Sequence, residues 1–138
     1  MRKTRPQPPR RQNSSMAKIL VAEDDGEVRA LIVRALNEGG HLLTEAEDGA
    51  AALDALNHHN NEFDLLLADV KMPIMDGIAL ALAAGRDHPE VAIILMTGFT
   101  DQRERAHGLD ALVHDVIAKP FTLGQIQVAV KEALLAGR

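Results

Sequence analysis

From Lys18 onward, short apolar runs alternate with longer segments of helical periodicity, and this alternation repeats five times. Parallel strands need connections long enough to hold a helix, so such a chain is expected to form a parallel sheet covered by helices on both faces. We expect strands at about 18–23, 41–46, 63–68, 91–96 and 112–118, and helices at about 26–37, 50–58, 78–85 and 101–109, with a last helix that ends the chain. The sequence thus predicts an α/β fold with a doubly wound, five-stranded parallel sheet.

A single domain accommodates this pattern, because 138 residues leave room for one ordinary unit. Two expected helices carry apolar residues at helical spacing: Val28, Leu31, Ile32 and Ala35 in the first, and Leu123, Ile126, Val130 and Leu134 in the last. After the second helix, His58 and His59 fall in a polar junction. Because adjacent histidines point in different directions, we expect surface residues there and no metal site.

The first 15 residues differ sharply in charge from the rest of the chain. They hold five of the 15 basic residues and none of the 20 acidic ones, together with several Pro, Gln and Ser. We expect residues 1–15 to be a disordered basic extension. Because Met16 could itself begin a chain, an extended gene start or a remnant of the expression vector is favoured over an arm that docks to an acidic partner. The domain is therefore expected to span residues 16–138, and its acidic balance argues against nucleic acid as a partner.

The amino-acid composition limits the cellular compartment that we expect and the kinds of reactive and metal-binding groups that are available. The chain has no cysteine, which excludes disulfides, thiol nucleophiles and cysteine-ligated zinc and fits a reducing compartment. No apolar run approaches the roughly 18 residues that a membrane span needs. We expect a soluble cytoplasmic protein without a membrane partner.

Polar residues end four of the five expected strands. Glu23 and Asp24 follow the first, Asp69 the third, Thr97 the fourth and Lys119 the fifth. In an open parallel sheet the carboxyl ends of the strands form the ligand-binding edge. Neighbouring carboxylates repel one another unless a cation bridges them, and an all-oxygen ligand set favours Mg²⁺. Lys119 and Thr97 suit the oxygens of a phosphoryl group, so the sequence predicts a magnesium-dependent phosphate site.

These residues resemble the signature of response regulator receiver domains. The resemblance spans Met16 to about Leu135 and rests on the acid pair, Asp69, Thr97 and three short motifs: Met72-Pro73, Asp76-Gly77 and Lys119-Pro120-Phe121. It implies a flavodoxin-like, CheY-like fold with five strands in the order 2-1-3-4-5, five helices and a cis bond between Lys119 and Pro120.

The resemblance also implies a role for each site residue. Asp69 would be the phosphoacceptor; Asp24, Asp69 and the backbone carbonyl of Lys71 would ligate Mg²⁺, with Glu23 acting through water; Thr97 and Lys119 would bind the phosphoryl oxygens. The run Glu23-Asp24-Asp25 offers two acid pairs, and aligning Arg29 with the family's usual helix arginine favours Glu23-Asp24. Asp25 would then cap the first helix, although direct metal ligation stays open.

We expect Asp69 to attack phosphorus in line, without a protein base, because the carboxylate is already ionised. The donor would be a histidine kinase or a histidine phosphotransfer protein. The switch region would comprise Gly98, Phe99, Val116 and Pro120, and Val116 replaces the usual Tyr or Phe. Coupling would then run through backbone movement around residues 98–100 or through the Phe99 ring.

Two output classes fit a receiver of this kind, and a phosphatase is a third hypothesis from a different class. Similarity over Met16–Val33 and Val91–Thr122 resembles CpdR-type single-domain receivers, which implies a phosphorylation-controlled adaptor in regulated proteolysis and the cell cycle, with a protease or its substrate as partner. A phosphorelay intermediate is the alternative. A haloacid-dehalogenase-like phosphatase is disfavoured, because its nucleophile belongs to an Asp-x-Asp pattern after the first strand. No enzyme activity is expected beyond phosphoryl transfer to and from Asp69, and the chain is expected to be a monomer or a weak homodimer.

Overall fold

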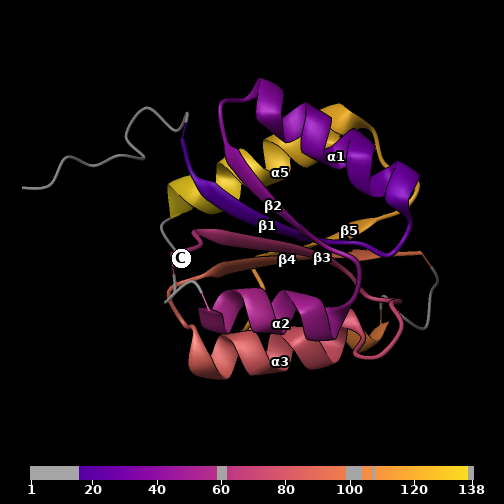
Figure 1. Cartoon of the computed structure of the whole chain (residues 1–138), viewed down its shortest axis with the longest axis vertical. Helices are drawn as coiled ribbons and strands as arrows, with labels where there is room; N and C mark the ends of the chain where they lie inside the picture. Colours follow the sequence, from indigo (N-terminus) through magenta and orange to yellow (C-terminus); the bar gives the residue numbers. More distant parts are fainter. Residues whose placement is uncertain (1–15, 59–61, 99–103, 107, 137–138) are drawn as a thin grey trace, which may run out of the picture.

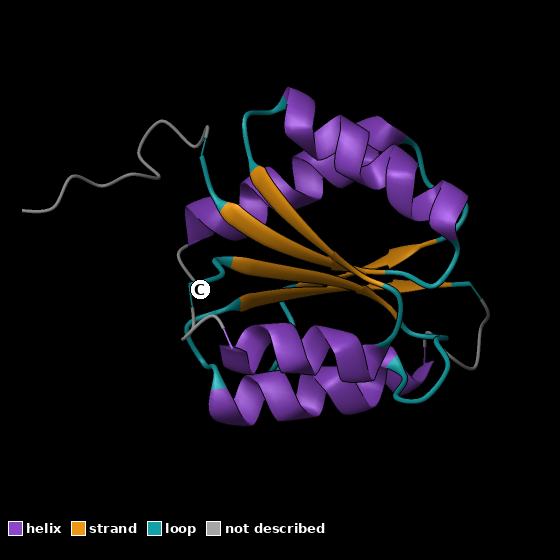
Figure 2. Cartoon of the chain, viewed as in Figure 1, coloured by secondary structure: helices purple, strands orange, loops and turns teal. Residues whose placement is uncertain are grey.

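The computed structural model describes residues 16–58, 62–98, 104–106 and 108–136, which form a sheet between two layers of helices (Figures 1 and 2). The five strands are β1 (Lys18–Ala22), β2 (Leu42–Ala46), β3 (Leu65–Asp69), β4 (Ala92–Thr97) and β5 (Asp115–Ala118). All neighbouring strands are parallel, in the order β2-β1-β3-β4-β5. The predicted fold class and strand order are confirmed.

The labelled helices are α1 (Gly26–Glu38), α2 (Gly49–His58), α3 (Gly77–Asp87) and α5 (Leu123–Ala136). Figure 1 shows α1 and α5 on one face of the sheet and α2 and α3 on the other. Of the helix predicted at 101–109, residues 104–106 are helical, while 99–103 and 107 lie outside the described residues, as does the extension 1–15. Within the described part of the chain, no helix is both long and apolar enough to cross a membrane.

Two apolar cores hold the layers together, one on each face of the sheet. Central strands alternate between them: Leu20 and Leu66 pack towards α2 and α3, whereas Ile19 and Leu67 pack towards α1 and α5. This arrangement explains why β1, β3 and β4 are almost continuously apolar. Because both faces of these strands are covered, their polar residues are confined to the strand ends, where the site lies.

The structure corrects two details of the sequence interpretation. The fifth strand begins at Asp115 rather than near 112, because Leu112 and Val113 both donate backbone hydrogen bonds to the carbonyl of Leu109 and so form a turn. In α1 the buried residues are Ile32, Ala35 and Leu36, whereas Leu31 is 50% exposed. Leu31 therefore lies on the flank of the helix and contributes to a surface groove instead of the core.

Candidate functional site

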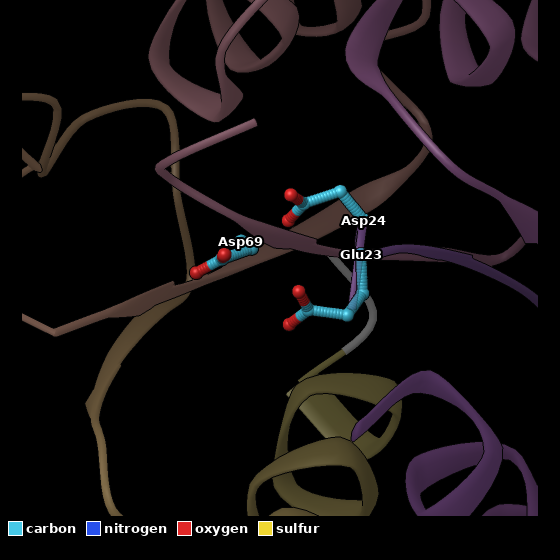
Figure 3. Close-up of side chains that lie close together, drawn as sticks. All are labelled: Glu23, Asp24 and Asp69. Carbon is cyan, nitrogen blue, oxygen red and sulfur yellow. The ribbon is translucent and has the colours of Figure 1, made fainter. Parts of the chain in front are cut away.

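Three carboxylates meet at the carboxyl ends of two adjacent strands (Figure 3). Glu23 and Asp24 follow β1 and Asp69 is the last residue of β3, and one carboxylate oxygen from each lies within 4.8 Å of the others. Glu23 and Asp69 are buried and Asp24 is exposed. Among the described residues, this trio is the one group of three or more side chains that could bind a metal ion. Its ligand atoms are all oxygens and Asp24 is exposed to solvent, which suits Mg²⁺.

Lys119 is the counter-ion of the two buried carboxylates. Its Nζ lies 3.2 Å from Asp69 Oδ1 and 3.2 Å from Glu23 Oε1. The residue follows β5, and its backbone N–H donates to the carbonyl of Thr97 at the end of β4. The Lys119–Pro120 peptide bond is cis, as predicted. One ammonium therefore bridges two acids that belong to separate strands.

Electrostatics make this arrangement costly without a further cation. Burial raises the pKa of Glu23, and the nearby Asp69 charge raises it further, while Lys119 opposes both effects. Burial likewise raises the pKa of Asp69, against the lowering effect of Lys119. Burial disfavours the charged form of Lys119, yet the Asp69 and Glu23 carboxylates raise its pKa. One lysine does not compensate three acids, and a divalent cation fits the remaining negative charge.

At the end of β4, Thr97 offers a buried hydroxyl and Gly98 an open stretch of backbone. The Thr97 hydroxyl is fully buried and has no hydrogen-bond partner among the described residues. Buried hydroxyls are rarely left unsatisfied, because the lost hydration costs free energy. A Cβ added to Gly98 would meet nothing within 4 Å, so the backbone there is open. An oxygen-rich ligand would find both a donor and space.

The acid run 23–25 is resolved as the sequence predicts. The Asp25 carboxylate accepts hydrogen bonds from the backbone N–H groups of Glu27 and Val28, at 2.9 and 3.2 Å. Asp25 is thus the N-cap of α1, and its side chain is committed to the helix. This leaves Glu23 and Asp24 as the pair beside Asp69.

Arg29 is a functional candidate that the sequence interpretation missed, because it served there only to set the alignment. Its Nη1 donates to the backbone carbonyl of Glu23 at 2.7 Å, and its Nε donates to the Glu45 carboxylate at 2.9 Å. The available signal was its position four residues after Asp25, since helical side chains point back towards the N-terminus of the helix.

The remaining predicted residues lie around the site or outside the described part of the chain. Val116 is partly buried against the core beneath α2 and α3, and Phe99 is outside the described residues. Lys71 is exposed two residues after Asp69, and its carbonyl ligand role stays a prediction. His58 is exposed beside Asp54 on α2, so it is a surface residue as expected.

An apolar groove begins at the site and runs between α1 and the start of α5. Its volume is about 660 Å³. It is lined by Val28, Leu31, Ile32, Gly98, Lys119, Pro120, Phe121, Thr122 and Leu123. Leu31 and Leu123 are 50% and 38% exposed, so the lining presents apolar surface to solvent. The groove therefore connects Lys119 and Gly98 at the site to an exposed apolar surface.

Comparisons with known proteins agree with this geometry. The sequence model described as the response regulator receiver domain matches residues 19–131. The chain is 36% identical over 121 residues to the response regulator receiver protein CpdR of Brucella abortus (strain 2308), which covers 88% of this chain and 99% of that protein. It is 33% identical over 121 residues, 88% of this chain, to 13% of the sensor kinase CckA from the same organism.

A solved structure supports the fold independently. The crystal structure of a response regulator receiver domain protein from Clostridium thermocellum matches with a TM-score of 0.80 at 24% identity, over 87% of this chain and 95% of that one. At that identity the likeness concerns the fold alone. The family match over residues 19–131 includes the carboxyl end of every strand that contributes to the site.

Proposed function

Because the chain belongs to the response regulator receiver domain family, we propose that it is a two-component phosphorylation switch whose acceptor is Asp69. The observation that carries this proposal is the Lys119 ammonium, held 3.2 Å from Asp69 and from Glu23 at the edge where the third carboxylate also lies. Such an arrangement prepares one carboxylate for attack on phosphorus and supplies positive charge where negative charge develops.

Each residue of the site would have its own role in phosphoryl transfer. An Asp69 oxygen forms the new bond to phosphorus while the bond from phosphorus to the donor's imidazole nitrogen breaks, and the released imidazole takes its proton from solvent. Lys119 neutralises charge on the phosphoryl oxygens, and the unpartnered Thr97 hydroxyl donates a hydrogen bond to one of them. Mg²⁺, held by Asp24, Asp69 and the Lys71 carbonyl with Glu23 behind a water, would supply further positive charge.

The direct test is incubation of the purified chain with acetyl phosphate and Mg²⁺, followed by intact mass and peptide mapping. We expect one phosphate-sized gain, located on the peptide that contains Asp69 and removed by hydroxylamine, which cleaves acyl phosphates. Chelation of Mg²⁺ should prevent the gain, because the trio then lacks its compensating charge. A chain that gains no phosphate from acetyl phosphate or from a phosphohistidine donor would contradict the proposal.

Phosphorylation would act as a switch through the end of β4. A phosphoryl group adds about −1.5 to −2 charge and strong acceptor oxygens, which would draw the Thr97 hydroxyl towards Asp69. The backbone that follows Thr97 begins at the exposed Gly98, so a movement of Thr97 is passed to the segment after β4. Val116 is too small and apolar for the usual aromatic rotamer switch, so coupling would run through backbone movement around Gly98 or through the Phe99 ring.

Receiver domains take their phosphoryl group from histidine kinases, and we propose that the groove between α1 and α5 seats the donor protein. Lys119 and Gly98 line this groove, so a donor protein that brings phosphohistidine to Asp69 would lie next to it. The exposed apolar side chains Leu31 and Leu123 would then be covered in the transfer complex.

The docking role predicts a selective defect in Leu31→Glu. Transfer from a kinase that phosphorylates the wild-type chain should slow at least about tenfold, because a charge would be buried in an apolar contact. Phosphorylation by acetyl phosphate should stay at the wild-type rate. Leu82→Glu is the matched control, since Leu82 is 48% exposed on α3, across the sheet. Equal kinase transfer in both variants would rule out this docking surface.

For output we favour a phosphorylation-controlled adaptor in the cytoplasm, supported by similarity to CpdR along 99% of that protein. A relay intermediate is the second candidate, favoured by similarity to part of the sensor kinase CckA. Capture of partners on the unphosphorylated chain separates the two, because an adaptor retains a protease or its substrate and a relay retains only phosphotransfer proteins. The phosphatase alternative has no support, as β1 is followed by Glu23-Asp24-Asp25 without an Asp-x-Asp pattern.

A further inference from the structure

Arg29 connects three elements around the acid pair. The side chain extends from α1 and donates one hydrogen bond to the backbone carbonyl of Glu23, after β1, and another to the Glu45 carboxylate on β2. It is 17% exposed, whereas its partner Glu45 is 50% exposed. The guanidinium also packs near Gly26, where an added Cβ would lie 3.6 Å from Nη2. The side chain is therefore held in one place by neighbours on several sides.

The carbonyl that Arg29 binds is well placed to control Asp24. A peptide unit is planar, so the carbonyl oxygen of Glu23 and the backbone nitrogen of Asp24 turn together. The Glu23 nitrogen is fixed by the Ala46 carbonyl at 3.0 Å, and the Glu23 carboxylate accepts from the Asp25 nitrogen at 3.1 Å. The guanidinium additionally fixes the peptide unit between Glu23 and Asp24 through its bond to the Glu23 carbonyl. It thereby sets the direction in which the Asp24 side chain leaves the backbone.

Asp24 depends on a fixed backbone more than Glu23 and Asp69 do. Glu23 and Asp69 are buried, so packing restricts their side chains, but Asp24 is exposed. Its carboxylate nevertheless has to meet the Asp69 carboxylate for both to ligate one cation. A fixed backbone direction lowers the conformational entropy that Asp24 loses when it binds.

We propose that Arg29 is a positioning residue for the divalent cation: it fixes the peptide unit between Glu23 and Asp24 and thereby raises the affinity of the trio for Mg²⁺. The proposal rests on the phosphorylation switch proposed above and deepens it. Simple electrostatics gives the opposite sign, because a nearby guanidinium repels a cation and its removal should strengthen Mg²⁺ binding. The direction of the change in affinity therefore separates positioning from charge.

The test is a calorimetric titration with Mg²⁺ in the absence of any phosphodonor. Arg29→Gln and Arg29→Lys should both weaken Mg²⁺ binding about tenfold, the low end for residues that orient metal ligands. Arg29→Lys retains the charge, so its loss of affinity reports geometry alone. Glu45→Gln leaves the bond to the Glu23 carbonyl and should weaken binding only about twofold. Arg34→Gln, on the same helix with a 76% exposed side chain, should bind as the wild type does.

Two results would overturn the inference. Unchanged or tighter binding in Arg29→Lys would contradict it while leaving the switch proposal intact. A wild-type chain that binds no Mg²⁺ would remove both. Urea midpoints measured with a chelator keep the comparison sound, because variants that unfold near the wild-type midpoint have retained the fold. If Arg29→Gln fails that control, the graded order of Arg29→Lys, Glu45→Gln and Arg34→Gln still decides the matter.

Discussion

Replacing Asp69 by asparagine is expected to abolish phosphoryl uptake and, without Mg²⁺, to raise the free energy of unfolding by about 1 kcal/mol. An amide is not a nucleophile towards phosphorus, so the acyl phosphate cannot form. The stabilisation arises because the substitution removes one of three adjacent carboxylates, while Lys119 keeps its contact with Glu23 at 3.2 Å. In the absence of Mg²⁺, Asp69 is thus expected to lower the free energy of unfolding of the protein.

The same prediction has a pH dependence. Burial raises the pKa of Asp69 above its ordinary value, so the folded state resists ionisation of this group. Stability from the protonated form is present below the pKa of the unfolded chain and is lost as pH rises through the higher pKa of the folded state. The difference in free energy of unfolding between Asp69→Asn and wild type should therefore be largest near neutral pH and should vanish in acid.

Urea unfolding with a chelator at pH 7.5 and at acidic pH measures this difference. Mg²⁺ should stabilise the wild type and have much less effect on Asp69→Asn, because one ligand is gone. Asp54→Asn is the control, since Asp54 is an exposed acid on α2 that does not belong to the trio. A variant less stable than wild type at pH 7.5 would mean that the contact between Asp69 and Lys119 outweighs burial and repulsion.

The predictable part of this molecule follows from the covering of the central strands. Because β1, β3 and β4 are apolar on both faces, their bounds and their polar ends can be read from composition along the chain. Strand order does not follow from periodicity and depended on the family resemblance. Once the strands are parallel, the ends that carry Asp69, Thr97 and Lys119 share one edge.

The parts that escaped prediction depend on contacts between elements. Arg29 acts on a backbone carbonyl, which a sequence pattern of side chains does not reveal. Leu31 fits the helical period of α1, but the helix is rotated so that Ile32 and Leu36 face the sheet. The start of β5 depends on a turn closed by backbone bonds to Leu109. Each is decided by three-dimensional packing rather than by local propensity.

Gly77 is another residue whose role only the structure reveals. It is the first residue of α3, and its backbone N–H donates to the carbonyl of Val70 at 2.8 Å. A Cβ at this position would lie 2.9 Å from the Val70 Cα and would overlap the backbone carbonyl of Asp69 itself. The three atoms nearest to this Cβ all belong to the backbone, so the overlap cannot be relieved by movement of a flexible side chain. Glycine therefore allows α3 to pack directly on the end of β3, which carries Asp69.

Gly77→Ala should lower the free energy of unfolding by about 2 kcal/mol or more, as overpacking against fixed backbone does. If the strand end yields instead, Asp69 moves relative to Lys119, and a displacement of about 1 Å can slow transfer roughly 100-fold. Stability and acetyl phosphate kinetics should therefore fall together, measured by urea unfolding and by intact mass over time. Gly124→Ala is the matched control: Gly124 is the second residue of α5, and within 4 Å its Cβ would meet only Thr122 Oγ1, at 3.8 Å, so no backbone of another element is in its way. Equal stability and equal kinetics in Gly77→Ala and wild type would show that this close approach is not required, and that α3 can shift without disturbing Asp69.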